Sequence, residues 1–209
     1  MSADDEPGDA EGRVNRRDEV VRTALELIAE RGYRRASLAQ VAARLGMSAP
    51  GVLHYFPSKD ALLMAVLAER SRQSRALAET AAPGRNDTDV LLTWLAGTVA
   101  RNSAEPLLTQ LHTIVSADSI TEGHPAQEMM RERYREARGR VADNIAADEA
   151  RPHLAAQAEP LAALILAAMD GLQLQWLLDP RAVDMSASFG LLREAVLALG
   201  AATSEPRDR

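Results

Sequence analysis

Apolar side chains recur every three or four residues along most of this 209-residue chain, and no stretch shows the alternation of a strand. In the segment 16–31, for example, Val21, Ala24 and Ile28 share one face of a helix. Alanine and leucine supply 39 and 27 residues, while aromatic residues make up only 3% of the chain. This composition favours helices over sheets, because strands prefer β-branched and aromatic residues. We therefore predict an all-α protein.

Two short helices with clear start and stop signals follow the first predicted helix. Ser37 begins a capping-box signature, and Gly46 ends the helix that follows it. Ser48 can cap a third helix over residues 49–56, which Pro57 ends because the residue before a proline avoids the helical conformation. A longer helix followed by two short ones, joined by a tight turn, is the arrangement of a helix-turn-helix.

Charge is distributed unevenly along a chain whose net charge is −6. Residues 13–75 contain twelve basic and six acidic side chains, whereas residues 76–209 contain twelve basic and nineteen acidic ones. A basic block that coincides with a helix-turn-helix indicates an anionic partner such as DNA. Lys59, the only lysine, stands at a predicted helix start, where a cation opposes the helix dipole unless an anion docks there. The alternative for Lys59 is a solvated surface residue.

The same patterns divide the chain into four parts. We predict a disordered acidic tail over residues 1–12, a helix-turn-helix DNA-binding domain over 13–58, a larger helical domain over 59–203 and a short disordered tail over 204–209. Within the larger domain we expect helices near residues 59–82, 90–103, 106–116, 126–148, 160–178 and 185–199.

Several classes of protein do not fit this sequence. The absence of cysteine excludes disulfides, cysteine-based zinc sites and thiol nucleophiles. No His-x-x-x-His pair, glycine-rich phosphate loop or nucleophile elbow is present, so we expect no cofactor, no metal site and no enzyme activity, with a spatially assembled catalytic site as the alternative. Neither an uninterrupted apolar run of about 18 residues nor a secretory signal pattern occurs, and we expect a cytoplasmic protein without a membrane span.

The segment from Ser37 to Leu63, SLAQVAARLGMSAPGVLHYFPSKDALL, resembles the TetR-type (TetR/AcrR) transcriptional regulators. The layout from Arg17 onward does so as well, and the Gly32-Tyr33 pair and the Phe56–Lys59 segment are especially specific matches. The resemblance implies a homodimer that inserts one recognition helix per subunit into the major groove of a pseudo-palindromic operator. It also implies a repressor that a small-molecule effector releases from DNA. A ligand-insensitive DNA-binding or partner-binding dimer is the alternative.

Carried over position by position, the resemblance implies phosphate contacts for Ser37 and Lys59 and a backbone contact for Tyr55. It places the start of the third helix against base edges, but the side chains there are small or apolar and cannot form bidentate base contacts. Direct readout therefore falls mainly on Ser48 and His54, with thymine-methyl contacts and DNA shape contributing. The predicted DNA-contacting residues are Ser37, Ser48, Ala49, Pro50, Gly51, His54, Tyr55 and Lys59.

The last two long helices carry apolar faces that could pack against a second copy as a four-helix bundle, as the resemblance implies, or could form an ordinary intrachain core. The predicted interface residues are Leu161, Leu164, Ala167, Ala168, Gly171, Trp176, Phe189, Leu192 and Val196. Polar, aromatic and methionine side chains within apolar helices are candidates for effector binding, although each also suits a core or surface role. These candidates are Trp94, His112, Met130, Tyr134, Met169, Asp170 and Gln173.

Overall fold

The computed structural model describes residues 7–81 and 87–201, which form nine α-helices and one 3₁₀ helix and contain no strand. The elements are α1 (Pro7–Arg31), α2 (Leu38–Arg44), α3 (Ala49–Tyr55), α4 (Lys59–Ala81), α5 (Thr88–Ala104), α6 (Pro106–Asp118), α7 (Gln127–Ala146), η1 (Pro152–Gln157), α8 (Ala158–Leu178) and α9 (Met185–Ala201). The predicted all-α class is confirmed, and most predicted helix limits lie within two residues of those observed.

The first helix begins earlier than the sequence predicts. We expected a disordered tail over residues 1–12, but α1 already begins at Pro7, so residues 7–12 are helical. Proline suits the first position of a helix, where its missing N–H costs no hydrogen bond. The rest of this tail prediction, residues 1–6, lies outside the described residues, as does the predicted tail over 204–209.

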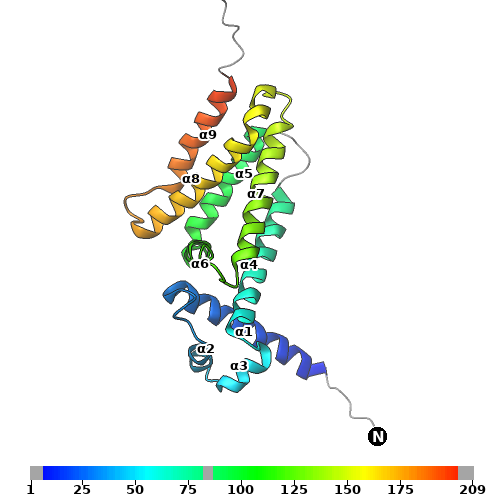
Figure 1. Cartoon of the computed structure of the whole chain (residues 1–209), viewed down its shortest axis with the longest axis vertical. Coiled ribbons are helices and arrows are strands. Elements are labelled where there is room, and N and C mark those ends of the chain that lie inside the picture. Colours follow the sequence, from blue (N-terminus) through cyan, green and yellow to red (C-terminus); the bar gives the residue numbers. More distant parts are fainter. Residues whose placement is uncertain (1–6, 82–86, 202–209) are drawn as a thin grey trace, which may run out of the picture.

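The described residues form two hydrophobic cores, one around α1–α3 and one around α8 and α9, and these two groups of helices lie towards opposite ends of the molecule in Figure 1. The first core lies under α1–α3 and includes Leu63 and Val66 from the start of α4. Leu111 and Val115 of α6 and Met130 of α7 belong to it as well. The helix-turn-helix therefore packs directly on the larger helical part. The predicted domain boundary after residue 58 cuts through this core, because the first turns of α4 pack on α1–α3.

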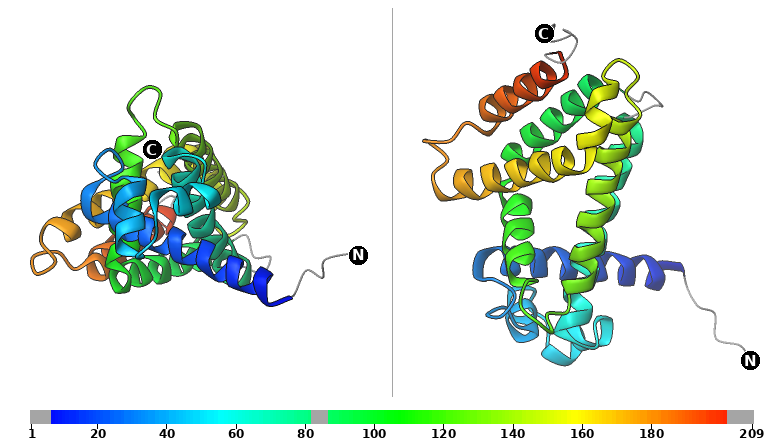
Figure 2. Two further views of the ribbon diagram at one scale, coloured as in Figure 1. Left: turned by 90° about the horizontal axis from the view of Figure 1, so that it is seen from below. Right: turned by 45° about the horizontal axis from the view of Figure 1, so that its top comes forward.

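The second core is formed by α5, the end of α7, η1, α8 and α9. Figure 2 shows α5, α8 and α9 towards the end of the molecule remote from α2 and α3, where α9 packs against both α5 and α8. Leu161, Phe189 and Val196 are buried in this core within a single chain, and Trp176 and Leu192 pack against it. Leu161, Phe189 and Val196 thus fit the intrachain alternative and are withdrawn from the predicted dimer interface. Trp176 and Leu192 are only half-buried, and their place at a dimer interface stays a prediction. Both faces of α8 are apolar, so periodicity alone could not tell which face points inward.

A second apolar stripe on α8 stays uncovered in this chain. Leu164, Leu174 and Leu178 are 63%, 48% and 77% exposed, and they follow one another at helical spacing along one face. On α9, Leu191 and Leu199 are 69% and 41% exposed. Leucines scattered singly over a surface are common, but exposed leucines that share one helix face form a continuous apolar patch, which is typical of an interface.

The stretch Pro152–Leu178 is, within the described residues, the one segment long and apolar enough to cross a membrane. The core helix of a globular protein passes the same test of length and composition, and a single such helix is weak evidence for a span. Only 28% of its apolar window is buried within the chain. We attribute the high apolar content and low burial of this segment to the exposed leucine stripe of α8 described above.

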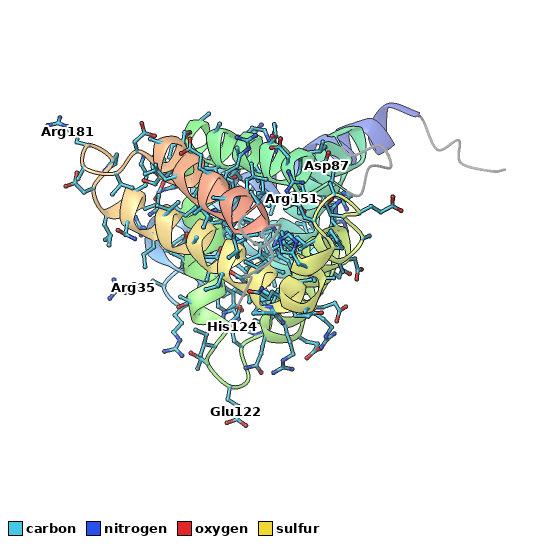
Figure 3. All side chains as sticks on the ribbon, turned by 90° about the horizontal axis from the view of Figure 1, so that it is seen from above. Arg35, Asp87, Glu122, His124, Arg151 and Arg181 are labelled. Carbon is cyan, nitrogen blue, oxygen red and sulfur yellow. The ribbon has the colours of Figure 1, made fainter. Side chains whose placement is uncertain are left out.

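Asp148 holds the end of α7 against the start of α5. Its carboxylate accepts hydrogen bonds from the backbone N–H groups of Thr88 and Ala150, each at 3.0 Å, and from Nη1 of Arg151 at 2.9 Å. The same guanidinium lies 3.8 Å from Oδ1 of Asp87, and Figure 3 shows both labelled side chains at this end of the molecule. Burial alone would raise the pKa of Asp148, but these hydrogen bonds outweigh it and lower the pKa to about 2.

We expect Asp148→Asn to lower the free energy of unfolding by about 2 kcal/mol at neutral pH, because the variant lacks the charge that these donors stabilise. Since the folded-state pKa is depressed, the contribution of Asp148 is complete above the ordinary value of 3.8 and is lost as pH falls towards 2. Urea unfolding of both proteins at neutral and acidic pH measures the difference. Asp143→Asn, an exposed substitution in the last turn of α7, is the matched control; equal effects of the two substitutions would contradict this account of Asp148.

Candidate nucleic-acid interface and adjoining pocket

The turn between α2 and α3 has the geometry that its sequence signals predict. Ser37 forms a complete capping box at the start of α2, in which its Oγ accepts from the backbone N–H of Gln40 at 3.3 Å. Gly46 has a φ of +62°, a conformation that favours glycine, and Oγ of Ser48 accepts from the N–H of Gly51 at 3.1 Å at the start of α3. Buried Val52 fixes the inner face of α3 on the first core, so the opposite face of this helix is oriented outward.

The residues predicted to approach base edges form one exposed surface at the start of α3. Ser48, Ala49, Pro50 and His54 are exposed, while Gly51 is half-buried. The ring of Tyr55 packs against the first core, and its centroid lies 5.4 Å from that of His54 in an edge-to-face arrangement. The polar side chains of this surface are those of Ser48 and His54.

The basic side chains of this unit differ in whether an acidic side chain already pairs with them. Arg44 forms two hydrogen bonds with Glu30, at 3.0 Å and 2.5 Å, and Arg16 pairs with Glu19 at 2.7 Å. These two arginines, which the charge count treats as available, therefore already have acidic partners. Arg34 and Arg35, between α1 and α2, are exposed and form no ion pair within the described residues. In Figure 3 the side chain of Arg35 extends away from the body of the molecule.

Lys59, the first residue of α4, is half-buried and held by contacts within the chain. Its Nζ donates to the carbonyl oxygen of Arg34 at 3.2 Å and lies 4.2 Å from the centroid of the Tyr33 ring. Burial lowers the pKa of Lys59, and the neighbouring Asp60 partly opposes this effect. An ammonium group has three donors, so the bond to Arg34 leaves donors for an anion at the start of α4.

A cluster of five side chains, which we call the junction, connects the helix-turn-helix with the loop between α6 and α7. It consists of Tyr33, Lys59, Asp60, Ser119 and His124. The hydroxyl of Tyr33 donates to Oδ1 of Asp60, and its ring lies edge-to-face on the ring of His124 with the centroids 5.1 Å apart. Oγ of Ser119 lies 3.4 Å from Nδ1 of His124. Residues from the end of α1 and the start of α4 thereby contact the end of α6 and the loop after it.

His124 is buried in this junction, whereas Glu122 of the same loop points outward in Figure 3. The N–H of Ala126 donates to Nδ1 of His124 at 3.2 Å, which places the imidazole proton on Nε2. Nε2 has no hydrogen-bond partner within the described residues. Burial lowers the pKa of His124; the charges of Arg34 and Lys59 act in the same direction, and those of Asp118 and Asp60 oppose it. The ring packs as an aromatic group against Tyr33.

A pocket of about 620 Å³ opens between α6, α7 and α8. Four of the seven predicted effector-binding residues line it: His112, Met130, Tyr134 and Asp170. The other three do not: Met169 and Gln173 are buried on the inner face of α8, and Trp94 packs against the second core. The lining residues that the sequence analysis missed are Thr113, Ser116, Ala117, Ser119, Ile120, Gln127, Arg131, Gly171 and Leu174. Several of them lie three or four residues from a predicted pocket residue on the same helix, and this helical spacing could have identified them.

Asp170 and Tyr134 form the polar centre of this pocket. The hydroxyl of Tyr134 donates to Oδ2 of Asp170 at 2.8 Å, and Nε2 of His112 lies 3.6 Å from Oδ1 of the same carboxylate. Burial raises the pKa of Tyr134 to about 12, and the charge of Asp170 adds to this effect. The phenol is therefore a neutral donor at physiological pH. The side chains of Tyr134 and His112 hold the carboxylate of Asp170 at the pocket.

The pocket and the junction share the end of α6. Ser116, Ser119 and Ile120 line the pocket, and Ser119 also contacts His124 in the junction. A group bound in the pocket would therefore touch the residues that hold the α6–α7 loop against Tyr33.

Comparison with known proteins gives one family match and many structural neighbours. Residues 20–66 match the model of the bacterial regulatory proteins of the tetR family. Among curated proteins, no match was found.

The structural neighbours resemble the whole described fold. A transcriptional regulator from Rhodococcus sp. Rha1 has a TM-score of 0.73 at 22% identity, covering 87% of this chain and 96% of its own. A regulator from Saccharomonospora viridis, solved in complex with choline, has a TM-score of 0.67 at 20% identity, with coverages of 88% and 96%. A TerR/AcrR-family regulator from Aquifex aeolicus VF5 has a TM-score of 0.67 at 18% identity, with coverages of 88% and 98%. At these identities the likeness establishes the fold.

We expect Tyr33→Phe to lower the free energy of unfolding by about 1 kcal/mol, because it removes the hydroxyl that donates to Asp60 while keeping the ring on His124. Chemical denaturation measures the change. Tyr55→Phe is the control, since its hydroxyl forms no hydrogen bond within the described residues. If both variants lost the same stability, the Tyr33–Asp60 bond would contribute nothing specific to the junction.

Proposed function

Since this chain belongs, through its N-terminal domain, to the tetR family of DNA-binding transcriptional regulators, we propose that it is a homodimeric repressor of a pseudo-palindromic operator. A small molecule bound between α6, α7 and α8 releases it from that operator. The observation that carries the proposal is the exposed start of α3, set in a helix-turn-helix whose inner face is fixed on the first core.

Phosphate contacts come from the groups around α3. The start of α2 at Ser37 and the start of α4 at Lys59 each present backbone N–H groups, which bind phosphate well. Arg34 and Arg35 add cations that no acidic residue within the described chain neutralises. These contacts position the protein on the duplex without reading its sequence.

Base reading is assigned to the exposed residues of α3. Ser48 and His54 supply the hydrogen-bonding groups, and Ala49 and Pro50 offer apolar surface for thymine methyl groups. Gly51 brings the backbone close to the bases, and Tyr55 lies towards the sugar-phosphate backbone. With so few bidentate donors, sequence-dependent DNA shape accounts for part of the selectivity.

The dimer is assigned to the uncovered apolar stripe of α8 and α9. Leu164, Ala167 and Gly171 from the predicted interface lie on this stripe, with Leu174 and Leu178 continuing it along α8. Leu191 and Leu199 extend it onto α9. Ala168, also predicted at the interface, is half-buried beside the stripe. Two such helices from each subunit form a four-helix bundle that sets two copies of α3 in successive major grooves, about 34 Å apart.

Effector control rests on the pocket and its contact with the junction. The Saccharomonospora viridis relative was solved in complex with choline, and we assign the corresponding role, binding of a small molecule of its own, to this chain. A ligand that favours a different spacing of α6 against α7 and α8 shifts the dimer towards states in which the two copies of α3 no longer match the operator. Operator binding also assigns the protein to the cytoplasm.

Selection of bound sequences from a random duplex pool tests the central proposal. We expect enrichment of an inverted repeat, because a two-fold symmetric dimer reads two equivalent half-sites. No enrichment would overturn sequence-specific binding, and enrichment of a single half-site would overturn the dimeric reading.

We expect Lys59→Ala to weaken binding to the selected operator and to unrelated DNA by a similar factor, because its ammonium contacts phosphate rather than bases. The slope of log affinity against log salt concentration should decrease by about one unit. Fluorescence anisotropy at several salt concentrations measures both. Arg181→Ala removes an equally positive, exposed side chain in the loop between α8 and α9, which extends from the periphery of the molecule in Figure 3, and should leave both values unchanged. An unchanged slope for Lys59→Ala would remove Lys59 from the interface.

We expect the double substitution Leu164→Glu and Leu191→Glu to convert the dimer into folded monomers, because it places charges on a desolvated apolar interface. Analytical ultracentrifugation measures the mass, and circular dichroism shows that the helices persist. Leu53→Glu, at an exposed leucine of α3, should leave the dimer intact. A dimer that survives the double substitution would place the interface elsewhere.

A further inference from the structure

Asp170 is an ionisable group in a pocket with apolar walls. Its carboxylate lies on α8. Three apolar side chains line the same pocket: Met130 of α7, Ile120 of the loop that follows α6, and Leu174 of α8. The side chain of Asp170 is 38% exposed, so it is accessible to a molecule entering the pocket.

No permanent cation neutralises this carboxylate. Within the described residues, Asp170 forms no ion pair with an arginine or lysine; its partners are the neutral hydroxyl of Tyr134 and the imidazole of His112. A carboxylate set among apolar groups, whose partners are a phenol and an imidazole rather than an arginine or a lysine, retains a preference for a positive partner.

The second charged residue of the pocket, Arg131, is already paired. It donates to Oε2 of Glu128 one turn earlier on α7, and their side chains are 57% and 72% exposed. The pair therefore lies at the solvent edge of the pocket, and its two charges offset each other. An anionic ligand would have to displace Glu128 and approach Asp170 at the same time, and both steps are unfavourable.

We propose that this pocket binds an organic cation, with an ammonium or amidinium group at Asp170 and an apolar body against Met130, Ile120 and Leu174. The inference deepens the proposed function, on which its regulatory meaning rests. The ring of Tyr134, fixed by its hydrogen bond to Asp170, adds an aromatic surface beside the charge, which favours cations. The pocket volume of about 620 Å³ suits a ligand of drug-like size.

Three probes that share one alkyl chain test the charge preference: hexylammonium, 1-hexanol and hexanoate. Isothermal titration calorimetry of the full-length protein, without DNA, should show hexylammonium binding at least about tenfold more tightly than 1-hexanol, with hexanoate weakest. Asp170→Asn keeps an oxygen that accepts from Tyr134 and should remove most of the preference for the ammonium while leaving 1-hexanol binding unchanged.

Glu159→Gln is the matched control, since it removes the same negative charge from the exposed first turn of α8, outside the pocket. It should bind all three probes as the unmodified protein does. Circular dichroism and thermal unfolding confirm that both variants are folded. Equal binding of the three probes, preference for hexanoate, binding by none of them at millimolar concentration, or the same result for Asp170→Asn and Glu159→Gln would overturn the proposal.

The outcome is separate from that of the proposed function. Operator binding without a probe tests whether the protein recognises DNA, and calorimetry tests the ligand class without DNA. Binding of hexylammonium that leaves operator affinity unchanged would uphold the cation pocket and overturn effector control. Operator binding with no charge preference in calorimetry would uphold DNA recognition and overturn the cation pocket.

Discussion

The contact between Tyr33 and His124 is the interaction on which the arrangement of this molecule most depends. Tyr33 lies in the turn after α1 of the DNA-binding unit, and His124 lies in the loop between α6 and α7 in the larger helical part. Around them, Leu111, Val115 and Met130 of α6 and α7 complete a core whose other members belong to α1–α4. The helix-turn-helix therefore has no complete core of its own. The orientation of α3 relative to the uncovered faces of α8 and α9 is set by how α6 and α7 seat on α1.

The packing around this shared core also decides which basic side chains of residues 13–75 are held by contacts within the chain. Part of this charge is structural: Arg44 pairs with Glu30, and Lys59 is held by Arg34 and the Tyr33 ring. A side chain fixed in this way loses less conformational freedom when a phosphate binds than a freely moving one. Arg35 remains outside these contacts. The unit thus combines a positioned ammonium with an adaptable guanidinium, and the former depends on the junction.

The parts of the structure that could be predicted are those fixed within about four residues. The caps at Ser37 and Ser48 and the turn at Gly46 depend on local backbone hydrogen bonds, and the sequence pattern identifies them. The junction could not be predicted, because Tyr33 and His124 are far apart in the chain and neither carries a local signal. Leu161 and Leu164 are equally apolar, and only the packing of α7 against α8 buries the first and exposes the second. His112 and Asp170 were expected in a pocket and meet there, whereas Met169, beside Asp170, points into the core.

One helix serves both the pocket and the proposed dimer. Gly171 and Leu174 line the pocket and also belong to the exposed stripe of α8, directly after Asp170. A partner subunit packed on that stripe would hold α8 in place, so a ligand entering beside Asp170 would displace α6 or α7 instead. Of these, α6 is followed directly by Ser119, which contacts His124. In the proposed dimer, the response to a ligand would therefore reach the junction, and from there Tyr33 and Lys59 at the DNA-binding unit. Without a partner on α8, the same ligand could be accommodated by a shift of α8, and the response would not reach α3.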